Sequence, residues 1–165
     1  MRIKRKEQNQ MRRSLDLARE VQQSLLPSSV PEVAGLDIAG KSIYREKTGG
    51  DYYDFLNFKN GSSKRVDIII GDVAGHGLPS ALLMITARAL IRLRSSLPGS
   101  ISDIVTDVNH HLSHDTGESG RFMTLFYLSI DLVNKSIKWV RAGHDPAILY
   151  NPYDDSFQEL IGPGI

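Results

Sequence analysis

The sequence of 165 residues contains no cysteine. That absence excludes disulfide bonds and thiolate zinc sites, and it is compatible with a reducing compartment. Long apolar runs are absent too, since none approaches the roughly 18–20 residues that a membrane-spanning helix requires. The first residues, MRIKRKEQNQMRR, carry no apolar segment of a secretory signal. We therefore expect a cytoplasmic protein without a membrane span.

An excess of charge of one sign is also lacking, because 20 Lys and Arg nearly balance 19 Asp and Glu. The positive charges are uneven, however: residues 1–20 hold seven Lys and Arg against three Asp and Glu. No aromatic residue interrupts this basic segment, so a nucleic-acid function is not favoured. A solvated helix face is the simpler interpretation, and contact with an anionic membrane surface is the alternative. The hydrophobic fraction of 41% is that of one ordinary globular domain.

Residues 8–26, QNQMRRSLDLAREVQQSLL, are rich in helix formers and precede Pro27, which predicts one helix. A heptad-like seam runs along it, at alternating spacings of four and three: Met11, Leu15, Ala18, Gln22 and Leu25. Two interpretations stay open, a coiled coil that would form a homodimer and a helix docked on its own domain. We assign residues 1–30 to a helical linker, with a hinge at 27–35, and residues 31–165 to the domain.

From Leu36 onward, β-branched and aromatic runs predict strands before and after two consecutive helices. The first helix is expected at 78–97, and the second begins at a capping signal formed by Ser100 and Asp103. A tight turn is expected at Asn60-Gly61 and a loop at 114–120. The predicted strands are 36–44, 52–58, 65–73, 122–131, 136–143, 147–151 and 156–160. Hairpins around a helix pair favour an α+β fold of layered, mainly antiparallel sheets over alternating βαβ units.

Two aspartates follow glycines at the predicted ends of strands: Asp51 in GGDYYDF and Asp72 in IIIGDV. Glycine lets a backbone, an ion or water approach closely. Two converging carboxylates repel each other unless a proton or a cation intervenes, and Mg²⁺ or Mn²⁺ prefers such oxygen ligands. A water activated by a metal suits the hydrolysis of a phosphoester. The alternative is that each aspartate serves only a turn or a helix N-cap.

Other motifs in the chain give weaker evidence of a functional site. GDVAGHG has neither the phosphate-cradling nor the dinucleotide-binding glycine pattern, and no serine lies in a Gly-x-Ser-x-Gly elbow. His110 and His114 are four residues apart on a predicted helix and are candidates to chelate a metal, but the glutamate of a zinc-protease motif is missing. A solvated helix face is favoured for them. His144 in RAGHDP follows a predicted strand and is interpreted as a turn residue.

Five segments in order, AREVQQSLLP, GGDYYDF, GDVAGHGLPSALLM, FMTLFYLSID and RAGHDPAILY, resemble the bacterial branch of the metal-dependent PPM/PP2C-type protein phosphatases. This group includes the sporulation stage II E protein and the phosphatases that regulate sigma factors. The resemblance runs from about Leu17 to the last residue. It implies a PP2C-like layered α/β/β/α sandwich with an N-terminal linker helix, and two bound Mn²⁺ or Mg²⁺ ions. It also implies a serine/threonine phosphatase that acts on phosphoprotein partners such as anti-sigma-factor antagonists.

Carried over by motif, the resemblance implies that Asp72 bridges both ions, that the Val73 carbonyl binds one, and that Asp51 helps to hold the second. The water between the ions would attack phosphorus in line. The N-terminal helix would join an upstream sensor or receiver module to the catalytic domain. The residues expected around these ligands are Gly50, Gly71, His76 and Gly77.

The chain also departs from the family pattern. The eukaryotic branch has a histidine where this chain has Ala74, so we do not assign His76 as the general acid. Family members continue with a Thr-Asp-Gly segment and a later aspartate, both metal ligands, and we expect the chain to be incomplete at its C-terminus. With half of the acidic ligands it would bind metal weakly and have little or no activity. The alternative is a non-catalytic protein-interaction module of the same fold.

Overall fold

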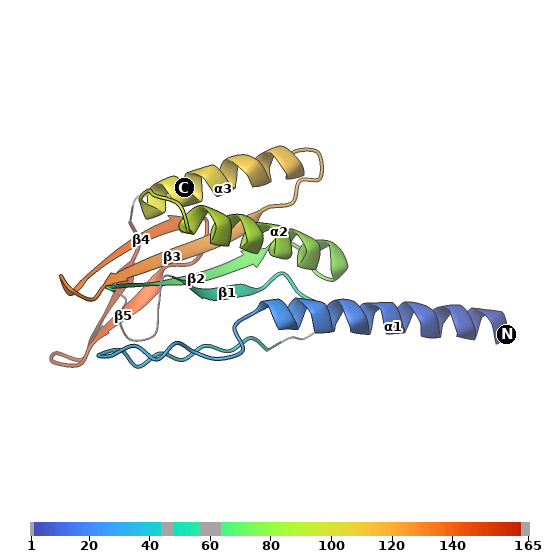
Figure 1. Cartoon of the computed structure of the whole chain (residues 1–165), viewed down its shortest axis with the longest axis horizontal. Coiled ribbons are helices and arrows are strands. Elements are labelled where there is room, and N and C mark those ends of the chain that lie inside the picture. Colours follow the sequence, from blue (N-terminus) through green and yellow to red (C-terminus); the bar gives the residue numbers. More distant parts are fainter. Residues whose placement is uncertain (1, 44–47, 57–63, 163–165) are drawn as a thin grey trace.

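The computed structural model describes residues 2–43, 48–56 and 64–162. Within these residues, three helices and six strands follow one another along the chain (Figure 1). They are α1 (Arg2–Leu25), β1 (Tyr52–Leu56), β2 (Arg65–Val73), α2 (Leu78–Ser95), α3 (Ile101–Thr116), β3 (Met123–Asp131), β4 (Ser136–Ala142), β5 (Ala147–Asn151) and β6 (Ser156–Leu160). None of the described helices is long and apolar enough to cross a membrane.

The central sheet has the strand order β1-β2-β3-β4, and every neighbouring pair in it is antiparallel. Its middle strand β2, RVDIIIGDV, is rich in the β-branched residues that suit a buried strand. The strands β5 and β6 form a separate antiparallel pair. The two helices α2 and α3 lie together over one face of the central sheet (Figure 1). The predicted α+β fold with antiparallel sheets is confirmed.

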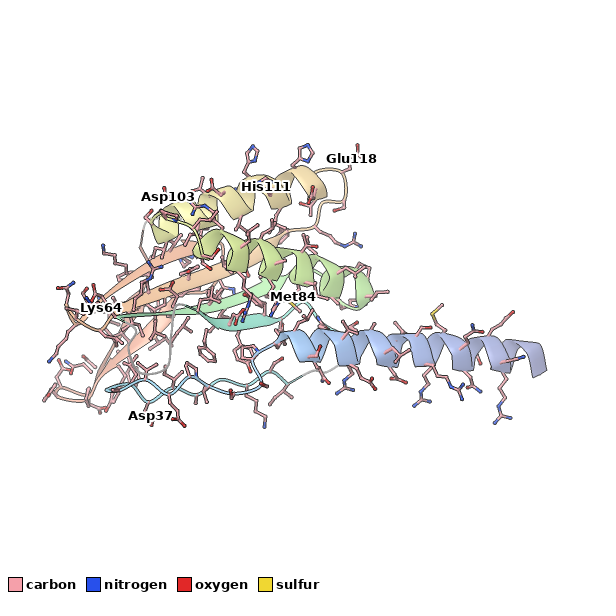
Figure 2. The ribbon with its side chains drawn as sticks, in the orientation of Figure 1. Asp37, Lys64, Met84, Asp103, His111 and Glu118 are labelled. Carbon is pink, nitrogen blue, oxygen red and sulfur yellow. The ribbon has the colours of Figure 1, made fainter. Side chains whose placement is uncertain are left out.

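The hydrophobic core lies between the helix pair and the central sheet. Met84 of α2 is completely buried and lies between its helix and the sheet (Figure 2). It meets Ile91 of the same helix, Ile104 of α3, and Ile69 and Tyr127 of the sheet in one cluster. Each large side chain buried in this way contributes about 1.5–3 kcal/mol. The helical spacing of these apolar residues therefore determines which face of each helix packs on the sheet.

Both helix starts follow from local sequence. The side chain of Ser100 accepts a hydrogen bond from the Asp103 N–H, and the Asp103 carboxylate accepts one from the Ser100 N–H, so the predicted capping box is confirmed. The helix α2 starts after Gly77, whose φ of 74° favours glycine, and has Pro79 in its first turn.

Several predicted boundaries were wrong. No strand forms at 36–43, where the structure shows only an isolated bridge between Val33 and Leu36. This segment packs on β1 through side-chain contact, because Gly40 lies against the rings of Tyr53 and Phe55 and does not pair with a strand. The helix α1 begins at Arg2, and α3 continues to Thr116 into the predicted loop. The predicted turn at residues 60–61 lies outside the described residues.

The last turns of α1 dock on the domain. Gln22 is 1% exposed and Leu26 is 8% exposed, whereas Met11 and Val21 are more than half exposed. The N-terminal part of α1 extends beyond the other elements, and its charged side chains point outward (Figures 1 and 2). The C-terminal end of the predicted seam, at Gln22, therefore docks on the chain's own domain. Dimerisation through the N-terminal part of the seam, from Met11 to Ala18, stays a prediction.

Candidate functional site

The carboxylates of Asp51 and Asp72 meet where β1 and β2 end. The two strands pair with Tyr52 opposite Gly71, and continuing this register by one residue places Asp51 opposite Asp72. The next pair is joined by a hydrogen bond of 3.3 Å from the Val73 N–H to the Gly50 carbonyl. Residues that are directly opposite in an antiparallel pair project from the same face.

That face is the one turned away from the helices. Tyr52 and Val73, the neighbours of the two aspartates, are 2% and 1% exposed and belong to the core beneath α2 and α3. Because side chains alternate along a strand, Asp51 and Asp72 point to the opposite side, and both are exposed. The structure therefore brings the two predicted site residues together on an accessible surface.

The two carboxylates influence each other electrostatically. Burial raises the pKa of the Asp72 carboxyl, and the charge and hydrogen bond of Asp51 raise it further, against the opposing effects of His144 and the Val73 backbone. Like charges directly opposite each other on neighbouring strands are destabilising. A proton or a cation between them relieves this repulsion, so the pair has the electrostatic character of a cation site.

Two glycines make this approach of the strands possible. A Cβ added at Gly50 would lie 2.6 Å from the carbonyl oxygen of Val73. A Cβ added at Gly71 would collide with the Met123 side chain and lie 2.9 Å from the carbonyl oxygen of Thr124. What approaches each glycine closely is therefore neighbouring protein: a larger residue at Gly50 would push apart the strands that carry Asp51 and Asp72, and one at Gly71 would push β2 away from β3.

Two further residues, which the sequence did not indicate as site residues, lie beside the carboxylate pair. Thr124 of β3 pairs with Asp72, and its hydroxyl donates to the Asp72 carbonyl at 3.4 Å. The same hydroxyl lies 2.8 Å from Nδ1 of His144. Because a hydroxyl has one hydrogen, donation to the carbonyl leaves its oxygen to accept from an Nδ1–H. His144 is therefore a residue of the site, and its place directly after a strand, in RAGHDP, was the available signal.

The paired aspartates open into a pocket of about 290 Å³. Its lining combines the two carboxylates and His144 with apolar side chains of the sheet, including Ile70, and with the segment 39–43. A concave site with few polar groups on an apolar wall is the usual form of a ligand pocket.

The remaining predicted residues lie elsewhere. His76 is exposed in the loop between β2 and α2, and Gly77 is the residue before α2. His110 and His114 are exposed on α3. Across the described residues, no group of three or more His, Asp or Glu is arranged to hold a metal ion. Both pairs therefore lack a third such ligand in the part of the chain that is described, and the carboxylate pair is the candidate centre because it lines a pocket.

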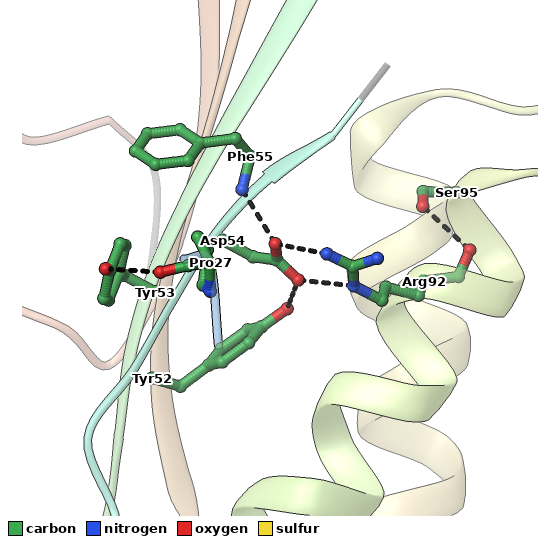
Figure 3. A network of polar contacts seen from close by, with 7 residues as sticks. All are labelled: Pro27, Tyr52, Tyr53, Asp54, Phe55, Arg92 and Ser95. Atoms are coloured by element: carbon green, nitrogen blue, oxygen red, sulfur yellow. Dashed lines mark hydrogen bonds and ion pairs between the residues drawn. The ribbon is translucent and has the colours of Figure 1, made fainter. Parts of the chain in front are cut away.

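An ion pair between a buried aspartate and a partly exposed arginine holds the strand that follows Asp51 (Figure 3). Asp54 is completely buried, and Arg92 of α2 donates to its two carboxylate oxygens, each at 2.6 Å. The Tyr52 hydroxyl donates to the same carboxylate at 2.9 Å. Burial, followed by the charge of Asp54, raises the pKa of this hydroxyl, which keeps it a donor. The strand β1 is therefore fastened to α2 by charge-assisted bonds three residues beyond Asp51.

The antiparallel sheet under a helix pair, with paired carboxylates at the strand ends, defines a protein of the bacterial PPM/PP2C phosphatase class. Residues 62–165 match the family model of the stage II sporulation protein E (SpoIIE), and the chain belongs to this family.

Individual relatives agree with this assignment. The chain is 29% identical over 161 residues to the phosphoserine phosphatase RsbU of Bacillus subtilis (strain 168), covering 96% of this chain and 46% of RsbU. It is 31% identical over 156 residues to the phosphoserine phosphatase RsbP of the same organism, covering 91% and 36%. The solved SiaA-PP2C domain of Pseudomonas aeruginosa superimposes with a TM-score of 0.70 at 26% identity, covering 94% and 62%. The chain thus spans less than half the length of either Bacillus relative.

Proposed function

We propose that this chain is a metal-dependent protein serine/threonine phosphatase that acts on a phosphoprotein of the anti-sigma-factor antagonist type. The observation that carries the proposal is the pairing of Asp51 and Asp72 at adjacent strand ends, facing an open pocket. Two relatives are named phosphoserine phosphatases, which supports the same reaction for this chain.

The donors at the centre suit a hard divalent cation. Asp51 and Asp72 supply carboxylate oxygens, and the Val73 carbonyl is the third proposed ligand. These are the oxygen ligands that Mg²⁺ and Mn²⁺ accept, and the mutual repulsion of the carboxylates favours a cation between them. When bound, a pair of such ions supplies an activated water and neutralises charge on the phosphoryl group.

The protein's own residues prepare the site. Gly50 lets the segment of Asp51 lie close to β2 so that the carboxylates stay opposite each other, and Gly71 lets β2 lie close to β3. Thr124 holds the His144 ring at the rim of the pocket. Ile70 and other apolar side chains of the sheet form one wall of the pocket beside the carboxylates. With only two carboxylates in the described site, we expect weak metal binding and low activity from this chain.

We further propose that α1 joins an upstream sensor or receiver module to this domain. Its N-terminal part extends beyond the other elements, where a preceding module or a second copy of the chain would contact it (Figure 1).

The test is phosphate release from a phosphoserine peptide, with and without Mn²⁺. We expect slow, Mn²⁺-dependent release that is lost in Asp72→Asn and retained in the control Asp37→Asn, since Asp37 is exposed and does not line the pocket. Release that is independent of Mn²⁺, or unchanged in Asp72→Asn, would overturn the proposal.

One observation favours a second candidate, a non-catalytic interaction module of the same fold. In the described part of the chain the acidic cluster has fewer than three members. This candidate predicts no phosphate release with Mn²⁺, together with stable binding of the antagonist protein in both phosphorylated and unphosphorylated forms.

A further inference from the structure

Gln22 of α1 makes a paired contact with the segment that carries Asp51. Its Nε2 donates to the Gly49 carbonyl at 2.6 Å, and the Gly49 N–H donates to its Oε1 at 3.3 Å. The amide nitrogen of Gln22 is thus paired with the carbonyl of Gly49, and its amide oxygen with the N–H of the same residue. Gln22 is 1% exposed, so its amide would lack a partner without this contact, whereas Gly49 is partly buried.

The segment from Gly49 to Asp51 is held from two sides. Gln22 bonds Gly49 on one side, and the Gly50 carbonyl accepts from the Val73 N–H on the other. The regular ladder of β1 starts only at Tyr52, one residue beyond Asp51. The backbone that leads into Asp51 therefore depends on α1 for one of its two lateral supports.

A polar residue is not needed at this place for packing alone. Leu26, one turn further along, is buried against the same domain with an apolar side chain. An apolar residue at position 22 would also fill the space, and it would cost no desolvation of an amide. What an apolar residue cannot do is determine where the two polar groups of Gly49 lie.

We propose that Gln22 is a positioning residue for the carboxylate pair. By fixing the Gly49 backbone, the α1 amide sets where Asp51 stands relative to Asp72 and to the Val73 carbonyl. The helix α1 is then an integral part of the centre, and undocking its last turns removes one support of Asp51. The consequence for catalysis rests on the proposed function, whereas the placement of Asp51 does not.

The experiment compares Gln22→Met, which keeps length and helix propensity but removes both hydrogen bonds, with the matched control Gln23→Met on the neighbouring exposed residue. Amide hydrogen exchange is followed by NMR in the metal-free protein. We expect the Gly49 and Val73 amides to exchange about tenfold faster in Gln22→Met, while the core amide of Ile69 keeps its protection. Gln23→Met should match the wild type.

The second readout is Mn²⁺ affinity by isothermal titration. We expect about a tenfold loss in Gln22→Met, the size of effect seen when a group that orients a ligand is removed. Equal acceleration of all core amides would mean a merely structural role and overturn the inference. So would wild-type exchange at Gly49 and Val73. Should Gln22→Met fail to fold, Gln22→Asn keeps a polar amide but is too short for both bonds, and the same exchange measurement decides.

The failure of the proposed function would look different. A wild-type chain that binds no Mn²⁺ would contradict the phosphatase proposal, and the exchange rates of Gly49 and Val73 would still decide whether Gln22 positions Asp51.

Discussion

Asp51 and Asp72 stand opposite each other, one residue beyond the last pair of β1 and β2, and both project away from the helices. In the interior of a sheet such a pair of like charges would destabilise the pairing of the two strands. Here burial, followed by repulsion from Asp51, raises the pKa of Asp72, and a divalent cation would balance the charge of the pair.

The first prediction concerns Asp72→Asn in metal-free protein. The raised pKa means that the folded state binds the Asp72 proton more tightly than the unfolded state. The contribution of Asp72 to stability is therefore fully present below the ordinary pKa of 3.8 and is lost as pH rises through the raised folded value. The Asn variant lacks this decline, so it should be more stable by about 0.2–1 kcal/mol at neutral pH.

Thermal unfolding in EDTA at acid and neutral pH measures this difference. Asp37→Asn is the control and should follow the wild-type pH profile. A variant that is less stable than the wild type at neutral pH would contradict the electrostatic account of the pair.

Gly50→Ala should damage the centre through the backbone. The new Cβ would lie 2.6 Å from the Val73 carbonyl, so the strand ends must separate, at a cost of about 1–3 kcal/mol. Denaturant unfolding gives the stability change, and isothermal titration should show loss of Mn²⁺ binding. Gly117→Ala is the matched control, because Gly117 has helical φ and ψ of −49° and −41°, and it should stay within about 1 kcal/mol of wild type. Equal effects of the two substitutions would argue against the close approach.

Arg92→Ala should be strongly destabilising. It leaves the completely buried Asp54 carboxylate without its charged partner, which costs about 3–5 kcal/mol. The control is Arg94→Ala, two residues along the same helix, whose partner Asp107 is half exposed. That change should cost only about 0.2–1 kcal/mol. Urea unfolding of both variants tests the contrast, which a difference below the error of the measurement would refute.

Ser100→Ala should weaken the start of α3. The hydroxyl accepts the Asp103 N–H, and its loss costs about 1 kcal/mol. Hydrogen bonds from Ser100 lower the pKa of Asp103, so the contribution of this carboxylate is present above its ordinary pKa and is lost as pH falls through the lowered folded value. Circular dichroism during thermal unfolding at neutral pH is the measurement. The control is Ser102→Ala, an exposed residue in the first turn of the same helix, and it should leave the midpoint unchanged.

Much of the fold was predictable from sequence. The helix pair and all six described strands lie close to their predicted ranges, and the capping box at Ser100 is present. The strand predicted at 36–44 does not form in the part that the structure describes. Alternating polarity shows that a segment has two different faces, but it does not show whether another strand is available to pair with it. That segment lies on aromatic rings of β1 instead.

The site was only partly predictable. Asp51 and Asp72 were identified because glycine before aspartate at a strand end is a local signal. Asp54 was not, since a buried aspartate in an aromatic run has meaning only with Arg92, 38 residues further on. His144 was interpreted as a turn residue because its contact with Thr124, 20 residues away along the chain, cannot be recognised from the neighbouring sequence.

Sequence alone determined the helices, most strands, the cap of α3 and the two carboxylates, because periodicity, capping and glycine act over a few neighbouring residues. Tertiary structure decided that these carboxylates face each other, that Gln22 packs on Gly49 rather than in a seam, and that Arg92 neutralises Asp54. Each of these contacts depends on register and packing between segments distant along the chain, and a linear pattern carries no record of which segments meet.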